Sequence, residues 1–164
     1  MTNKNGGTMK VKIIAMIIIV LTAITGCQST IINSPDTKAS EYNKLIVKDI
    51  SYDKLSRAIS FKTENKSQDI MTTPLHYTID KYEDNKWIKT NLTDDLVFIE
   101  LALMINPNES IDEVIDLQYV KAFGNGYYRI EKQYFSDVVI NQYIQFEVKD
   151  DEIISFESYN TISK

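Results

Sequence analysis

The amino-acid sequence predicts an all-β fold in which antiparallel strands form a sandwich. Apolar and polar residues alternate with a period of two over most of residues 44–164, as expected for half-buried strands. Short turn sequences interrupt the alternation at intervals that suit about seven to nine strands. No alternation of strand and helix patterns is visible, which argues against a parallel α/β fold.

The first predicted strands occupy residues 45–48 and 59–64. A hairpin is predicted over residues 75–90, with Glu-Asp-Asn-Lys at residues 83–86 as its turn. Trp87, the only tryptophan, opens the returning strand. Its ring is expected to pack in the core or against the hairpin, and stacking on an exposed ligand is the alternative.

Residues 97–105 are nearly all apolar, so they fit either a buried strand or a short helix. Glu100 in the middle of the run and the Asn-Pro-Asn stop at residues 106–108 favour the strand. Residues 111–120 form another extended run.

A Gly-rich turn at residues 123–126 precedes a predicted strand over residues 127–135. The alternation places Tyr128, Ile130 and Lys132 on one face of this strand. Because Tyr128 follows the turn that ends at Gly126, we expect it to act as a tyrosine corner. Its ring would pack inward while its hydroxyl bonds a nearby backbone group.

The C-terminal part of the sequence reads as one more hairpin. Residues 139–148 form a strand, residues 149–152 turn the chain, and residues 153–159 are expected to pair back.

The N-terminal segment has the pattern of a secretory signal. Lys4, Lys10 and Lys12 precede an apolar run at residues 13–24, and small residues follow it. A membrane-spanning helix needs roughly 20 apolar residues, so this run is too short for a stable span. An uncleaved anchor or a buried core helix is the alternative. Translation could start at Met1 or at Met9, since a complete signal follows either.

Residues 21–27 read Leu-Thr-Ala-Ile-Thr-Gly-Cys and resemble the lipobox of bacterial lipoproteins. The resemblance implies cleavage between Gly26 and Cys27 and a diacylglyceryl thioether on the Cys27 sulfur, often with an acyl chain such as palmitate on the new amino group. It therefore implies a membrane partner and a location on the extracytoplasmic face of the cell membrane. No cofactor is expected beyond this covalent lipid.

The domain organisation that follows is a signal peptide at residues 1–26, a lipidated cysteine with a flexible tether at 27–43, and one β-sandwich domain at 44–164. Cleavage would leave 138 of the 164 residues, and these form no disulfide because Cys27 is the only cysteine. Without the three lysines of the signal, 15 basic residues face 23 acidic ones, a net charge of −8. This acidity disfavours nucleic acid as a partner.

A second resemblance rests on three stretches, LHYTIDKYEDNKW at residues 75–87, FIELALMINPNES at 98–110 and FGNGYYRIEK at 123–132. They resemble a family of bacterial immunoglobulin-like domains, whose members are often lipoproteins of Gram-positive bacteria. The similarity spans about residues 45–149 and implies an immunoglobulin-like sandwich with structural motifs and no catalytic residues. The sequence departs from the family at residues 123–125, where Leu-x-Pro is common.

Catalytic chemistry finds little support in the sequence. His76 is the only histidine and lies in mid-strand, and no nucleophile-elbow sequence accompanies it. The paired acids at residues 83–84, 94–95, 112–113 and 150–152 mostly read as solvated turns rather than as hydrolase or calcium sites. We therefore expect a protein that is not an enzyme and has no metal site.

The leading functional hypothesis is a lipid-anchored surface module that binds a protein or a cell-wall component. The alternative is an inhibitor of an exported peptidase, with loops at residues 66–73 and 106–110 as the working surface. A hydrolase that uses the acidic turns is a third, weaker hypothesis. The sequence leaves the ligand and the oligomeric state open.

Overall fold

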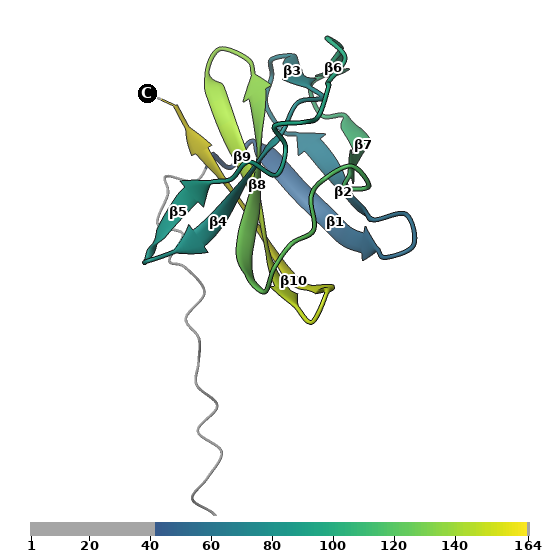
Figure 1. The fold of residues 1–164 in the computed structure, drawn as a ribbon. Helices are drawn as coiled ribbons and strands as arrows, with labels where there is room; N and C mark the ends of the chain where they lie inside the picture. Colours follow the sequence, from purple (N-terminus) through teal and green to yellow (C-terminus); the bar gives the residue numbers. More distant parts are fainter. Residues whose placement is uncertain (1–41, 164) are drawn as a thin grey trace, which may run out of the picture. The chain divides into compact units, whose positions relative to one another are not determined.

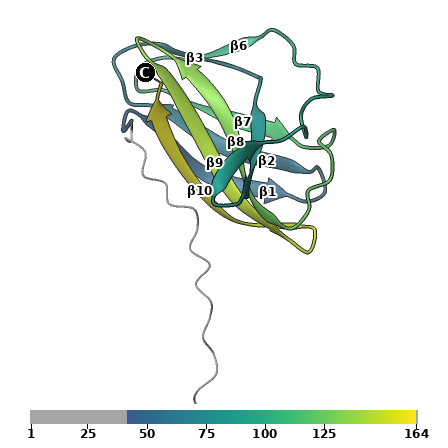
Figure 2. The same cartoon turned by 60° about the vertical axis from the view of Figure 1, so that its left-hand side comes forward.

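The computed structural model describes residues 42–163, which form ten strands in two antiparallel sheets (Figures 1 and 2). The strands are β1 (Leu45–Asp53), β2 (Ala58–Asn65), β3 (Met71–Pro74), β4 (Thr78–Glu83), β5 (Lys86–Lys89), β6 (Ala102–Ile105), β7 (Ser110–Asp116), β8 (Gly126–Phe135), β9 (Val139–Lys149) and β10 (Glu152–Ile162). The predicted all-β sandwich is therefore confirmed. Within the described residues, no helix is long and apolar enough to span a membrane.

The smaller sheet has the order β1-β2-β7, so β2 is its central strand. The larger sheet has the order β10-β9-β8-β3-β6, and β4 pairs with both β8 and β5. Figure 2 shows the long strands β8, β9 and β10 side by side. The outer strands β1 and β10 each contain a break in register typical of a β-bulge, whereas the β2–β7 register is unbroken.

The two sheets bury one large apolar cluster and one smaller one. Ile59 and Phe61 of β2 pack in the large cluster with Ile130 of β8 and Phe146 of β9. The smaller cluster includes Met71 and Tyr134. The alternation in β2 produces this arrangement, because every second side chain of the strand points into the space between the sheets.

Both predicted hairpins are confirmed. β4 pairs with β5 and β9 pairs with β10, each antiparallel. At the first turn Asp84 and Asn85 have φ values of 50° and 61°, and at the second Asp150 and Asp151 have values of 52° and 62°. Two consecutive positive φ values define the type I′ turn, whose twist matches that of the flanking strands.

The prediction for residues 97–105 was largely wrong. Only Ala102–Ile105 forms a strand, and Val97 and Ile99 are 95% and 68% exposed. The strand lies at the edge of its sheet and pairs only with β3, so its apolar residues are not covered on both sides. The prediction that residues 66–73 form a loop was also wrong at its end, because Met71–Pro74 is strand β3.

Candidate functional site

The predicted lipid-attachment residues Gly26 and Cys27 lie outside the described residues, so lipidation and cleavage stay predictions. The described chain begins at Tyr42, which packs against the smaller core cluster. The Asn160 side-chain amide donates to the carbonyl oxygens of Tyr42 and Leu45 at 3.2 and 2.6 Å. These bonds fix the start of β1 to β10.

The turn that leads into β8 has a structural role. Gly126 has a φ of 142°, a conformation that strains residues with side chains, and an added Cβ would lie 3.4 Å from Lys81 Cε. Two residues later the Tyr128 ring is buried, and its hydroxyl donates to the Gly124 carbonyl at 3.0 Å. The ring also packs edge-on to Phe123. This is the geometry that a tyrosine corner requires.

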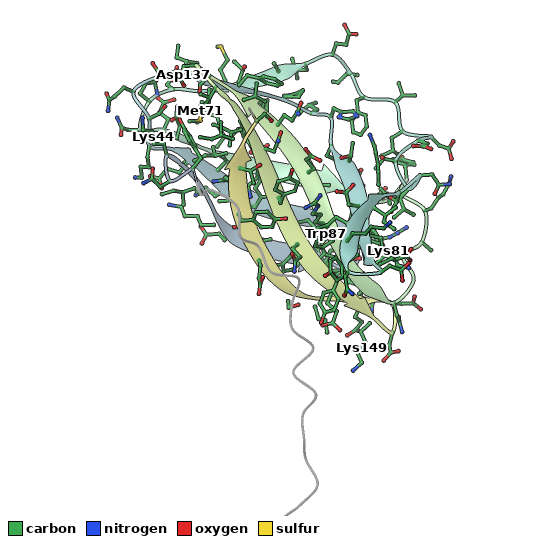
Figure 3. All side chains as sticks on the ribbon, turned by 90° about the vertical axis from the view of Figure 1, so that its left-hand side faces the viewer. Lys44, Met71, Lys81, Trp87, Asp137 and Lys149 are labelled. Atoms are coloured by element: carbon green, nitrogen blue, oxygen red, sulfur yellow. The ribbon has the colours of Figure 1, made fainter. Side chains whose placement is uncertain are left out.

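Trp87 lies on the β4–β5 hairpin (Figure 3) and is half-buried. The guanidinium carbon of Arg129 lies 4.7 Å from the centre of its ring, and the Tyr82 ring packs 5.1 Å away. A cation over an indole ring is a favourable contact. Trp87 therefore contacts residues of its own sheet, and Arg129 occupies a position over its ring that a stacking ligand would need.

Arg129 joins several strands on the outer side of the larger sheet. Its Nε and Nη2 donate to one carboxylate oxygen of Asp80 at 2.9 and 2.8 Å, and its Nη1 donates to the Tyr159 hydroxyl at 3.0 Å. The guanidinium also lies over the Tyr143 ring at 4.4 Å. Burial lowers the pKa of Arg129, but the hydrogen bonds to Asp80 and Tyr159 outweigh it and raise the pKa overall. Arg129 is therefore a permanent cation in a closed cluster.

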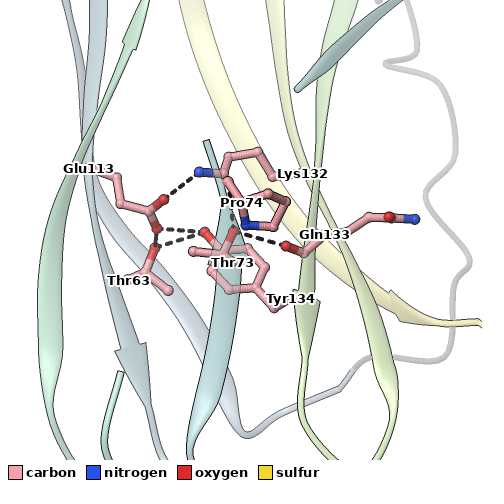
Figure 4. A network of polar contacts seen from close by, with 7 residues as sticks. All are labelled: Thr63, Thr73, Pro74, Glu113, Lys132, Gln133 and Tyr134. Carbon is pink, nitrogen blue, oxygen red and sulfur yellow. Dashed lines mark hydrogen bonds and ion pairs between the residues drawn. The ribbon is translucent and has the colours of Figure 1, made fainter. Parts of the chain in front are cut away.

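A second polar cluster lies buried between the sheets (Figure 4). Glu113 of β7 and Lys132 of β8 are 4% and 5% exposed, and their carboxylate and ammonium groups are 2.6 Å apart. The other Glu113 oxygen accepts hydrogen bonds from Thr63 at 2.5 Å and Tyr134 at 2.6 Å. Burial, followed by the charge of Glu113, raises the pKa of Tyr134 well above its ordinary value. The carboxylate thus has three donors.

The expectation that the Asp112–Glu113 pair belongs to a solvated turn was therefore wrong for Glu113. The residue lies in β7, where its burial alternates with that of exposed neighbours. A signal for this cluster was present in the sequence, since Lys132 falls on the same face of its strand as Tyr128 and Ile130. An inward-facing lysine requires a buried partner.

A cavity of about 290 Å³ lies beside this buried pair, along β7 and the chain from Leu96 to Phe98. Five consecutive residues, 112–116, line one side of it. Its apolar lining residues include Leu75, Leu96, Phe98 and Leu103. Apolar side chains therefore form one wall of the cavity, and strand β7 forms another.

Tyr77 also lines this cavity, and its burial predicts a pH-dependent contribution to stability. Its hydroxyl donates to the Asp116 carbonyl at 2.7 Å, and burial raises its pKa to about 12. The unfolded chain ionises Tyr77 near pH 10, so the stability that depends on this group is complete below pH 10 and declines through pH 12.

The free energy of unfolding of the native protein should therefore fall more steeply between pH 8 and pH 11 than that of the Tyr77→Phe variant. Urea unfolding should show a fall about 1 kcal/mol smaller in the variant. Tyr119→Phe is the matched control on an exposed tyrosine, and equal losses in the Tyr77 variant and the native protein would contradict the prediction.

The loops at residues 66–70 and 106–109 lie side by side. Asn65 holds them together, because its side-chain amide donates to the carbonyls of Asp69 and Ile105 at 2.7 and 2.9 Å. Its backbone N–H donates to Glu109, and its carbonyl accepts from Asn108. The structure thus brings together two loops that are about 40 residues apart in the sequence.

A family profile for the bacterial Ig-like domain matches residues 40–156. The chain belongs to the bacterial Ig-like domain family. The match is wider at both ends than the resemblance over residues 45–149. A search of curated proteins and a search of solved structures each gave no match.

The bacterial Ig-like domain is typically a non-catalytic module. His76 is exposed, and its ring packs edge-on to Phe98 at 4.8 Å. Within residues 42–163, no three His, Cys, Asp or Glu side chains are placed to hold a metal ion. The clusters around Arg129 and Glu113 are internally paired. Two surfaces of this Ig-like domain therefore merit consideration for a partner, the cavity side of β7 and the two adjoining loops.

Proposed function

We propose that this protein is a lipoprotein of the extracytoplasmic face of the cell membrane, anchored through lipid on Cys27. It presents its bacterial Ig-like domain as a non-enzymatic binding or structural module. The observation that carries the proposal is the position of Cys27. The only cysteine of the chain directly follows Gly26 at the end of a basic and apolar segment.

The physical chemistry of the anchor supports this proposal. A single acyl chain holds a protein on a membrane only marginally, whereas two or three hold it stably. The sequence of residues 28–43 is rich in Ser, Thr, Asn and Asp, a composition that predicts a tether, and a flexible chain of this length would reach about 20–25 Å. The domain would then work close to the membrane, where a membrane protein or a wall component at that boundary is the fitting partner.

Replacing Cys27 with alanine should abolish acylation, because the chain has no other thiol on which the thioether could form. Cells grown with an alkyne analogue of palmitate would show label on the native protein and none on Cys27→Ala. The variant should also keep the mass of the uncleaved precursor. Ser29→Ala, two residues along the tether, is the matched control and should be labelled and processed normally. A Cys27→Ala chain that still carries label would refute the lipid anchor.

Inhibition of an exported peptidase is a second candidate function. The adjoining loops at residues 66–70 and 106–109 support it, because neighbouring loops at one end of a β-sandwich can enter an active-site cleft. A panel of exported peptidases would be assayed with the full chain in detergent. Inhibition that is lost when the loop residues Lys66 and Asn108 are replaced by alanine would support this function. No inhibition at micromolar protein would exclude it.

A further inference from the structure

The hydrogen bonds at the two ends of the β2–β7 ladder fix which residues of β7 bond to β2. The Leu117 N–H donates to the Arg57 carbonyl at 2.8 Å, and the Asn65 N–H donates to the Glu109 carbonyl at 2.9 Å. Both pairs belong to the same unbroken register as the rest of the ladder. In an antiparallel ladder, hydrogen-bonded and non-hydrogen-bonded pairs alternate. The N–H and C=O groups of every odd-numbered residue of β7 therefore point toward β2.

The even-numbered residues Asp112, Val114 and Asp116 consequently direct their N–H and C=O groups away from β2. The Asp116 carbonyl shows this direction, since it accepts the Tyr77 hydroxyl from the opposite side. In the part of the chain that the structure describes, β7 ends its sheet and no further strand pairs with it. Apart from the Asp116 carbonyl, which already accepts the Tyr77 hydroxyl, this row of backbone donors and acceptors has no strand partner among the described strands, and such a row is a template for an added strand.

The other outer strands are less suited to accept a partner. β5 and β6 have only four residues each, and very short edge strands offer little to pair with. β1 and β10 carry register breaks at positions 48–51 and 154–156, where Asp49 and Ser155 have positive φ values. Such bulges twist an edge away from pairing. β7 has no such break, and its outer-face residue Val114 is 65% exposed.

The side chains around this edge define the chemistry of a fitting strand. On the outer face, Asp112 and Asp116 flank Val114 and are exposed; the Asp112 side chain is 84% exposed and only 3.5 Å from Lys62. On the other face lies the apolar cavity along residues 112–116. An added strand would therefore place cations opposite the two aspartates and apolar side chains opposite Val114 and into the cavity.

A second copy of this chain does not fit that description. In the antiparallel β7–β7 register that pairs all seven residues, Glu113 faces its own copy. In the shorter register centred on Val114, Asp112 faces Asp116 of the other chain. Like charges directly opposite each other destabilise a strand pair. The charge pattern thus favours a different, basic partner.

We propose that the free edge of β7 is a strand-addition site for an extended segment of a partner protein, with basic residues flanking an apolar centre. This inference rests on the proposed role as a binding module and names the class of its partner. Main-chain hydrogen bonds to Asp112, Val114 and the Asp116 N–H provide affinity, and the aspartates and the cavity provide selectivity.

The test uses the full chain in detergent and a fluorescein-labelled peptide, Thr-Lys-Leu-Val-Leu-Lys-Thr, followed by anisotropy. Val114→Pro removes an N–H that points away from β2, so it should leave the sheet intact and weaken binding about tenfold. Val114→Thr keeps the N–H and should bind as the native chain does. A peptide with glutamate in place of both lysines should bind about tenfold more weakly than the lysine peptide.

Hydrogen exchange on the native chain gives a second readout that needs no variant. The lysine peptide should protect the amides of Asp112, Val114 and Asp116. Protection elsewhere, equal binding of the two peptides, equal binding by Val114→Pro, or no binding at about 1 mM peptide would each overturn the proposal. The Cys27→Ala chain should bind the peptide equally well, so a failure of strand addition and a failure of lipid anchoring are distinguishable.

Discussion

Replacing Glu113 with leucine is expected to lower the free energy of unfolding by about 3–5 kcal/mol. The substitution leaves the Lys132 ammonium without its partner at 2.6 Å in a place where the side chain is 5% exposed. It also removes the acceptor of the Tyr134 and Thr63 hydroxyls. Buried polar groups without partners cost far more than the net gain from a satisfied bond. Urea unfolding of the purified chain measures the difference.

The double variant Glu113→Leu with Lys132→Met is the informative control. Apolar replacements of both ion-pair partners often leave stability unchanged or higher, because no charge is then buried. We expect the double variant to recover most of the loss of the single one. A loss below about 1 kcal/mol in Glu113→Leu would contradict the buried pair. A double variant no more stable than the single one would show that the loss arises from packing.

The second large effect is expected at Arg129. The Arg129→Met variant should lose about 2–3 kcal/mol, because it leaves the Asp80 carboxylate, which is 6% exposed, without its charged donor. It also removes the cation from the Trp87 and Tyr143 rings.

Arg129→Lys separates charge from shape at the same position. Lysine keeps the positive charge but cannot reproduce the planar fork that binds both Asp80 and Tyr159, so we expect an intermediate loss. Equal stability of the native, Lys and Met proteins in urea would show that the cluster contributes nothing, and equal losses in Lys and Met would show that charge plays no part.

The long strands could be predicted because their alternation is strong. In β2 and β8, nearly every second residue is buried, so the sequence pattern and the structure agree. β3 and β6 have four residues each and lie toward the edge of the larger sheet, and such short stretches carry too little alternation to be recognised. The apolar run, with Glu100 and the Asn-Pro-Asn stop, led to the wrong assignment of residues 97–101, since edge segments can expose apolar side chains.

The side-chain clusters could be predicted only in part. Alternation shows which face of a strand carries Lys132, but it does not show which residue of another sheet lies opposite. Glu113 and Lys132 come from different sheets, and the Arg129 cluster draws on five strands from β4 to β10. These neighbours depend on strand order and register, which a single sequence does not specify. The free edge of β7 likewise follows from strand order.

The intact mass of the protein isolated from cell membranes shows whether lipid on Cys27 anchors it. We expect one main species that begins at Cys27, with the mass of residues 27–164 increased by a diacylglyceryl group or by that group and a further acyl chain. A chain that retains residues 1–26, or one that begins elsewhere and carries no lipid, would contradict it.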